Sequence, residues 1–210
     1  MSGGKTAPIL IPMEVIFVRH GHAESNVYHP DNIVGSDLGL TPEGIRQAEA
    51  TGAHLAKLAL QGAIGPIDNP IFTSPYIRAR QTAEIIARHL QHSVMVDYRL
   101  KEIQKGDWHG MKVDDVMRLE EGVQDHERHS FRPPSSDTST PGENWFDVAD
   151  RMTDFIIEAK ENGYKSLLLV SHNHPIEIAA GKLRGLDVTE WKDNPIDNAA
   201  LLRMTEKDDI

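Results

Sequence analysis

Short apolar segments alternate with longer segments of helical periodicity along most of this chain, and no other feature restricts its fold as much. The apolar segments are rich in β-branched and aromatic side chains and are short enough to be buried strands. Because strands that alternate with helices are typical of α/β domains, we expect a three-layer α/β/α sandwich with a mainly parallel central sheet. The expected strands are residues 13–18, 70–75, 93–100, 165–172 and 198–204, and the expected helices are 40–60, 76–89, 145–163 and 174–186.

The segment from residue 40 to 60 has a well-defined helix start. Thr41 suits the N-cap position, and Pro42 suits the first helical position, where its missing N–H costs no hydrogen bond. The apolar residues expected on the buried face of this helix are Ile45, Ala48, Leu55 and Leu58.

One segment, from about residue 104 to 143, interrupts the alternation. It contains "HERHSFRPPSSDTSTPGEN", which is rich in Ser, Thr, Pro and charge and too poor in apolar residues to form a domain of its own. A chain of 210 residues forms one domain by default. We therefore expect one domain over residues 1–210, with residues 104–143 inserted as a lid over the active edge of the sheet.

The composition restricts the partners of this chain. With 22 Lys and Arg against 32 Asp and Glu, the net charge is −10, which argues against nucleic acid or an anionic membrane surface as the main partner. The lack of cysteine excludes a thiol nucleophile, a disulfide and a thiolate metal site. The first residues lack the apolar core of a secretory signal, and no apolar run reaches the roughly 18 residues of a membrane helix, so we expect a cytoplasmic protein.

Polar residues gather where the expected strands end. Ligands of open α/β sheets bind beyond the carboxyl ends of the strands, where this chain would place two arginines, at least two histidines and a carboxylate. One such residue alone is usually structural, but several of them at the same edge of the sheet would form a binding site for a small tetrahedral anion. The residues are Arg19, His20, Gly21 and His22 after the first strand, Thr73, Ser74 and Arg78 after the second, Glu102 after the third, and Ser171, His172, Asn173 and His174 after the fourth.

These side-chain types favour phosphoryl transfer. A neutral imidazole is a competent nucleophile toward phosphorus, and a neighbouring guanidinium keeps it unprotonated. Arginine meets phosphate oxygens two at a time. A carboxylic acid beside a dianionic phosphate keeps its proton and can donate it to a leaving alkoxide. The first strand therefore ends in Arg-His because it presents a nucleophile already seated in a phosphate pocket.

At these positions the chain resembles the histidine phosphatase superfamily, the phosphoglycerate mutase-like proteins. Five motifs occur in the family's order and span nearly the whole chain, which makes the resemblance far more specific than an Arg-His-Gly triplet alone. They are "VRHGHAESN" (18–26), "LTPEGIRQA" (40–48), "TSPYIRARQTAE" (73–84), "LKEIQKGDWHG" (100–110) and "VSHNHPI" (170–176).

The resemblance implies a metal-independent and cofactor-independent enzyme acting on a small phosphorylated substrate. It implies that His20 is transiently phosphorylated, and that Glu102 first protonates the leaving group and then activates water. Where family members usually carry glycine this chain has Asn173, which would narrow the pocket or add a hydrogen bond to the substrate. The residues implied to hold the phosphoryl oxygens are Arg19, Arg78, His172 and Asn26.

The family divides mainly into phosphatases and 2,3-bisphosphoglycerate-dependent phosphoglycerate mutases. "KGDWHGMK" is more similar to the phosphatase branch, where a tryptophan is common in this stretch. "RHSFRPP" (128–134) has a faint similarity to a mutase segment whose arginines grip the substrate carboxylate. We favour a phosphatase and keep the mutase as the alternative.

Two other classes of function stay open. The His-x-His pairs 20/22 and 172/174 allow a metal site, because residues two apart on a strand share a face. A catalytically inactive phosphate-binding module is also compatible with the motifs, although such a module would not need Glu102. The sequence assigns no role to His22 or His174, and it leaves the physiological substrate and the oligomeric state undetermined.

Overall fold

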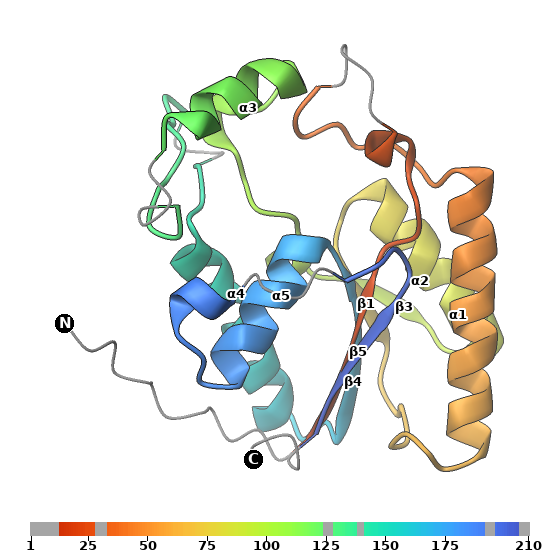
Figure 1. The fold of residues 1–210 in the computed structure, drawn as a ribbon. Coiled ribbons are helices and arrows are strands. Elements are labelled where there is room, and N and C mark those ends of the chain that lie inside the picture. The colour runs from red at the N-terminus through yellow and green to blue at the C-terminus, as the bar shows by residue number, and fades with distance from the viewer. Residues whose placement is uncertain (1–12, 28–32, 124–127, 138–140, 192–195, 206–210) are drawn as a thin grey trace.

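A five-stranded sheet in the order β3-β2-β4-β1-β5 forms the centre of the computed structural model, which describes residues 13–27, 33–123, 128–137, 141–191 and 196–205. Helices α1 and α2 cover one face of the sheet, and α4 and α5 cover the other (Figure 1). The expected three-layer α/β/α architecture with a mainly parallel sheet is confirmed. The strands are β1 Glu14–Arg19, β2 Ile71–Thr73, β3 Val94–Val96, β4 Ser166–Ser171 and β5 Leu201–Met204, and the helices are α1 Pro42–Leu60, α2 Ile77–Leu90, α3 Val113–Glu121, α4 Trp145–Glu161 and α5 Asn173–Leu183.

Strands β1 and β4 are parallel neighbours at the centre of the sheet, in register from Glu14 opposite Ser166 to Arg19 opposite Ser171. Alternate residues of a strand point to opposite faces, so β1 supplies both halves of the core. Phe17 packs with the cluster beneath α4 and α5, and Val18 packs with the cluster beneath α1 and α2. Burying each such side chain contributes roughly 1.5–3 kcal/mol, which fixes the ends of β1 and β4 side by side.

The third strand is shorter than the sequence predicts. Residues 93–100 were expected to form one strand, but pairing with β2 is limited to Val94–Val96. The Asp97 side chain then accepts a hydrogen bond from Arg99 N and caps a short 3-10 helix, Tyr98–Leu100. This turn buries Leu100 and directs the following residues across the carboxyl ends of the neighbouring strands.

Helix α1 begins as predicted, because the Thr41 side chain accepts a hydrogen bond from Gly44 N. The prediction for Ile45 is wrong, since this side chain is 46% exposed. The buried face of α1 is formed instead by Gly44, Ala48, Gly52 and Leu55. A Cβ atom at Gly44 would lie 1.9 Å from the carbonyl oxygen of His22, so the helix reaches the end of β1 only because this position has no side chain.

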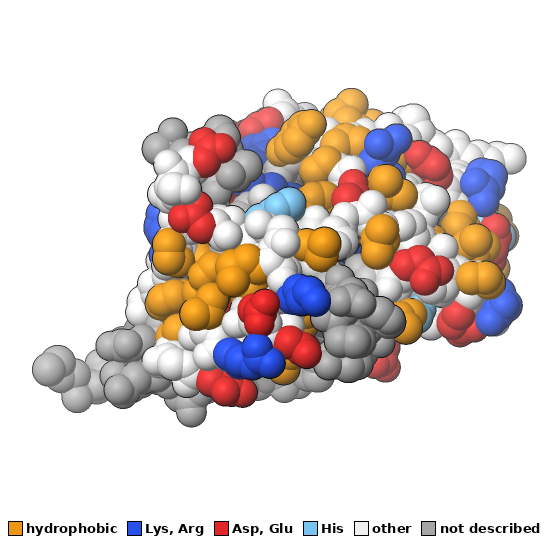
Figure 2. All heavy atoms as spheres, turned by 90° about the horizontal axis from the view of Figure 1, so that it is seen from above, with side chains coloured by type: hydrophobic (Ala, Val, Ile, Leu, Met, Phe, Trp, Pro, Cys, Tyr) orange, Lys and Arg blue, Asp and Glu red, His pale blue; other side chains and the backbone are white. Residues whose placement is uncertain are grey.

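The segment expected to be a lid extends above the carboxyl ends of the strands, where α3 lies apart from the sheet (Figure 1). Its described part contains a 3-10 helix, Gly106–Trp108, and α3, whereas residues 124–127 and 138–140 fall outside the described ranges. Trp108 is buried and stacks on Phe131, with ring centroids 5.5 Å apart. Figure 2 shows that this upper face mixes hydrophobic, acidic and basic side chains, so the net charge forms no broad acidic field there.

Within the described ranges, no helix combines the length and apolar character needed to span a membrane.

Candidate active site

The ends of β1, β2 and β4 are tied together by main-chain hydrogen bonds just beyond the sheet. His20 N donates to Ser171 O at 3.0 Å, and Ser74 N donates to Val170 O, also at 3.0 Å. His20 and Ser74 are both buried. The topology therefore brings the predicted polar residues of three strand ends into one place, at the edge where open α/β sheets bind ligands.

The His20 ring has a defined tautomer. Its Nδ1 lies 2.8 Å from Gly21 O, and because a carbonyl only accepts, Nδ1 carries the proton. Its Nε2 accepts a hydrogen bond from Arg78 Nε at 3.2 Å. Burial and the Arg78 charge lower the pKa of His20 to about 3. At neutral pH the imidazole is therefore uncharged, with its lone pair on Nε2.

Arg78, in the first turn of α2, connects the two buried histidines. Besides its contact with His20, it donates to Ser36 O at 3.2 Å, and its Nη2 lies 3.3 Å from His172 Nδ1. The guanidinium carbon lies 4.9 Å from the centre of the Tyr76 ring, within cation–π distance. Burial lowers the pKa of Arg78 below its ordinary value. Contacts on three sides fix the orientation of this guanidinium.

His172 is 0% exposed and faces protein groups on both ring nitrogens. Because Arg78 can only donate, His172 Nδ1 is the acceptor and Nε2 carries the proton, 2.8 Å from Ser74 Oγ. Burial holds the pKa of His172 well below its ordinary value, so this ring is also neutral. Its centroid lies 5.1 Å from that of His20.

Arg19 and Asn173 hold the backbone of Ile196 from two sides. Arg19 Nη1 donates to Ile196 O at 2.6 Å, and Ile196 N donates to Asn173 Oδ1 at 3.1 Å. The buried Nε of Arg19 has no hydrogen-bond partner within the described part of the chain. Burial lowers the pKa of Arg19 below its ordinary value, while the charge of Glu102 opposes this shift. A half-buried guanidinium with a buried, unused N–H is a group that a bound oxyanion would satisfy.

Glu102 lines the same cleft, with its side chain 24% exposed. Its carboxylate accepts from Ile103 N at 2.9 Å, and Oε1 lies 3.6 Å from His174 Nδ1. Burial raises the pKa of Glu102, but the interactions with His174 and with Ile103 N outweigh burial and hold the pKa well below its ordinary value. Glu102 is thus a carboxylate in the unliganded protein.

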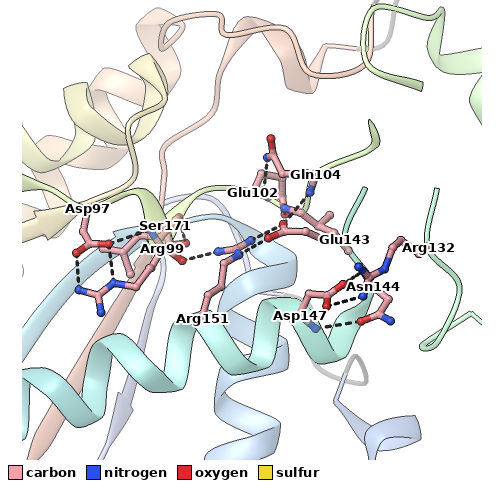
Figure 3. Close-up of polar contacts among 12 residues, drawn as sticks. Asp97, Arg99, Glu102, Gln104, Arg132, Glu143, Asn144, Asp147, Arg151 and Ser171 are labelled. Carbon is pink, nitrogen blue, oxygen red and sulfur yellow. Dashed lines mark hydrogen bonds and ion pairs between the residues drawn. The ribbon is translucent and has the colours of Figure 1, made fainter. Parts of the chain in front are cut away.

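The loop that carries Glu102 is anchored on both sides by buried polar groups (Figure 3). On one side, Ser171 Oγ donates to Leu100 O at 2.7 Å. On the other, Glu143 accepts from Gln104 N at 3.0 Å and is paired with Arg151 of α4 at 2.8 Å. Arg151 also donates to Arg99 O. Both side chains of the Arg151–Glu143 pair are almost buried, so the loop is held against α4 rather than free in solvent.

Together these residues surround a cleft of about 470 Å³. A second cavity, of about 410 Å³ between α5 and β5, shares no lining residue with the cleft and contains none of the predicted site residues. Residues lining the cleft include Arg19, His20, Asn26, Ser36, Tyr76, Arg78, Glu102, Ile103, Gln104, Lys105, His109, Asn173 and His174.

The predicted residues occupy different places around this cleft. Arg19, His20, Asn26, Arg78, Glu102 and Asn173 all line it, whereas His172 lies buried against Arg78 and Ser74. Asn26 already accepts a hydrogen bond from Ala23 N at 2.9 Å. The sequence did not single out Tyr76, Ser36, Gln104 or the Arg151–Glu143 pair. Of these, Tyr76 and Gln104 lie inside motifs, two residues before Arg78 and two residues after Glu102, and these positions were the signal available for them.

The second histidines of the two His-x-His pairs diverge. His22 Nδ1 lies 2.9 Å from Thr41 Oγ1, at the start of α1, whereas His174 lines the cleft beside Glu102. Among the described residues, no group of three or more His, Asp or Glu side chains is arranged to hold a metal ion. The spacing of the histidines therefore does not translate into a shared coordination geometry.

The histidine phosphatase superfamily (branch 1) matches residues 15–209, which is nearly the whole chain. The chain belongs to the histidine phosphatase superfamily. The superfamily assignment made from the five motifs is thus confirmed.

Curated relatives within the superfamily carry two kinds of name. Phosphoserine phosphatase 1 of Hydrogenobacter thermophilus is 27% identical over 94% of this chain and 90% of its own length. A probable phosphoglycerate mutase GpmB of Klebsiella pneumoniae is 32% identical over 83% of this chain and 76% of its own length.

Solved structures of the superfamily have the same fold. The mycobacterial glucosyl-3-phosphoglycerate phosphatase Rv2419c, in complexes with VO3, matches with a TM-score of 0.74 and 25% identity, over 92% of this chain and 91% of its own. The chain is thus similar to proteins named as phosphatases, and it also has relatives named as mutases.

Proposed function

We propose that this protein is a metal-independent phosphomonoester hydrolase that works through a phosphohistidine on His20. The observation that carries the proposal is the His20 ring, which is buried, neutral and held with its lone pair on Nε2 at the wall of the cleft. An imidazole in this state can attack phosphorus without first losing a proton. Its small phosphorylated substrate would fill the cleft of about 470 Å³.

In the first step, a bond forms between His20 Nε2 and phosphorus while the bond from phosphorus to the leaving oxygen breaks. In the unliganded protein Arg78 Nε donates a hydrogen bond to His20 Nε2. When the substrate binds, this N–H would donate to a phosphoryl oxygen instead, which leaves the Nε2 lone pair free to attack. Arg19, Arg78 and Asn26 line the cleft and would hold the phosphoryl oxygens, neutralising charge as phosphoryl transfer requires. For His172 we propose a role through Arg78, because its ring is completely buried and its Nδ1 faces that guanidinium.

Glu102 would transfer the protons of both steps. It is a carboxylate in the unliganded protein, but two negative charges on a bound phosphate raise the pKa of a neighbouring carboxyl group. Glu102 would therefore take up a proton with the substrate and donate it to the leaving alkoxide. In the second step it would accept a proton from the water that attacks the phosphohistidine, which restores His20 and releases phosphate.

The proposal is tested by phosphate release from p-nitrophenyl phosphate in excess chelator, comparing wild type, His20→Ala and the exposed-histidine control His54→Ala. We expect wild-type and His54→Ala activity to survive chelation, and His20→Ala to lose at least about 10³-fold in kcat, because a covalent nucleophile acts as a unit with its neighbours. Activity that persists in His20→Ala would exclude the phosphohistidine. Activity lost to the chelator would favour a metal enzyme.

A second variant tests Glu102. Glu102→Gln should lower kcat by about 10²–10⁴-fold on alkyl phosphates and much less on p-nitrophenyl phosphate, whose leaving group needs little protonation. Glutamine keeps the size of the side chain, so circular dichroism should be unchanged. Equal losses on both substrates would remove Glu102 from the role of acid.

A phosphoglycerate mutase is the second candidate, because of the 32% identical relative with that name. One observation speaks against it. Of the two arginines in "RHSFRPP", Arg132 is exposed and pairs with Asp147 of α4 at 2.6 Å, and Arg128 lines a neighbouring cavity of about 140 Å³; neither lines the cleft itself. Conversion of 3-phosphoglycerate to 2-phosphoglycerate in the presence of 2,3-bisphosphoglycerate would establish a mutase. Phosphate binding without either turnover would instead establish a binding module.

A further inference from the structure

The position of Glu102 defines the direction in which the leaving group extends from the cleft. This inference rests on the proposed function, in which the Glu102 carboxyl group meets the leaving oxygen. Two neighbours of that carboxylate, Ile103 and His174, line the cleft and also a smaller cavity of about 140 Å³ beneath the lid. Lys105 lines both as well. The carbon skeleton attached to the leaving oxygen therefore has this smaller cavity directly in front of it.

Six of the eleven residues that line the smaller cavity are aromatic or apolar. Trp108 and Phe131 are stacked with an interplanar angle of 28°. The full set of apolar lining residues is Ile103, Trp108, Val123, Phe131, Pro133 and Trp145.

The other five lining residues are titratable, namely Lys105, Glu120, Arg128, Glu143 and His174. Lys105 pairs with Glu120 at 2.5 Å, and Glu143 pairs with Arg151 at 2.8 Å. A leaving group with a carboxylate or an ammonium would compete with these pairs, whereas a neutral group would not disturb them.

We infer that the cavity lined by Trp108, Phe131 and Trp145 binds an uncharged aromatic ring on the alcohol side of the phosphomonoester. The size agrees, because an apolar protein cavity of about 150 Å³ is known to hold one benzene molecule. Aromatic walls offer stacked or edge-on contacts to such a ring in addition to burial of its surface. The substrate class is then an arylalkyl phosphate, in which a short linker joins the phosphate oxygen to the ring.

Binding is measured first, so that the result does not depend on turnover. Calorimetry compares 3-phenylpropylphosphonate with butylphosphonate, two non-hydrolysable ligands that differ in the ring. We expect the phenyl ligand to bind at least about ten-fold more tightly to the wild type. Phe131→Leu, and Val123→Phe, which fills the cavity, should both reduce this preference to less than about three-fold. The matched control Phe146→Leu, an exposed aromatic residue that lines neither cavity, should keep the preference.

Turnover is measured second, with 2-phenylethyl phosphate against n-propyl phosphate, whose leaving alkoxides are of similar basicity. A ten-fold preference in kcat/KM that Phe131→Leu abolishes would support the ring subsite. Equal phosphonate affinities, or a preference that Phe131→Leu and Val123→Phe leave intact, would overturn it. If both esters are hydrolysed equally, only the ring subsite fails. If neither is hydrolysed while the phosphonate preference holds, the proposed hydrolysis fails and the ring subsite stands.

Discussion

The carboxyl ends of β1 and β4 are two regions that look alike in the sequence and differ in the structure. The strands are parallel neighbours, with Arg19 opposite Ser171, and each is followed by a His-x-His pattern. The first histidines, His20 and His172, are equivalent, because both are buried, neutral and joined by Arg78. The second histidines are not equivalent, since His22 contacts the cap of α1 and His174 contacts the cleft carboxylate.

The difference comes from the backbone that follows each strand. After β1 the chain stays non-helical through Gly21, where a Cβ would lie 2.5 Å from Gly44 O, so His22 is held against the start of α1. After β4 the chain enters α5 at once, with Asn173 as its first residue. Residues two apart on a helix point in different directions, and His174 is thereby turned to the cleft while His172 stays beneath it. Identical spacing therefore produces one structural and one cleft-lining histidine.

The largest effect that would sharpen this comparison concerns the first histidines. If His20 is the nucleophile and His172 acts through Arg78, then His172→Ala should lower kcat/KM by about 10²-fold, well short of the His20→Ala loss, as expected when one electrostatic contact is weakened. It should also weaken inhibition by inorganic phosphate, because Arg78 would lose one of its three fixed contacts. A His172→Ala loss as large as that of His20→Ala, with phosphate inhibition unchanged, would contradict the positioning role.

Substitution of His174 should change the activity, whereas substitution of His22 should change the stability. His174→Gln removes the contact that contributes most to holding the pKa of Glu102 down, so the pKa of Glu102 should rise. A rise means that Glu102 keeps its proton to higher pH, and the alkaline limb of kcat/KM on alkyl phosphates should move upward. His22→Gln should leave this profile unchanged and lower the free energy of unfolding by about 1 kcal/mol, because it weakens a helix cap.

The measurements are pH–rate profiles and urea unfolding of both variants. A shifted pH–rate profile in His22→Gln, or an unshifted one in His174→Gln, would contradict the structural role of His22 and the influence of His174 on Glu102.

A further expectation concerns acid stability, to which His20 and His172 should contribute by similar amounts. Folding lowers the pKa of His20 to about 3 and that of His172 well below 6.5, so the unfolded chain binds protons that the folded chain does not. Stability is then fully present above the unfolded pKa and is lost as pH falls below it. Between pH 6 and 5 each histidine should remove up to about 1.4 kcal/mol per pH unit.

Urea unfolding at pH 7, 6 and 5 tests this expectation. His20→Asn and His172→Asn should each reduce the slope of stability with pH by a similar amount, whereas the control variant His54→Asn, which changes an exposed residue, should keep it. A wild-type stability that does not change from pH 7 to 5 would show that the two rings are protonated in the folded protein.

The sequence by itself was enough to predict the three-layer architecture and the main candidate residues of the active site. Hydrophobic periodicity is local, so the central strands, the helices and the Thr41 cap could be located, and parallel strands then placed Arg19, His20, Arg78 and Glu102 at one edge. A prediction from hydrophobic periodicity uses apolar side chains only, so it placed Ile45 on the buried face of α1. In the structure that face includes Gly44 and Gly52, which have no side chain and allow close packing. The same prediction extended the third strand through Asp97, whose side chain caps a turn instead.

Only the tertiary structure decided what each polar side chain contacts. The Arg151–Glu143 pair joins α4 to the residue before that helix's cap and to the loop of Glu102, contacts that no local spacing encodes. The divergence of His22 and His174 likewise depends on the backbone path after each strand. Side-chain direction is set by backbone dihedrals and by packing between segments distant in sequence, whereas strand and helix periodicity is set by neighbours within a few residues.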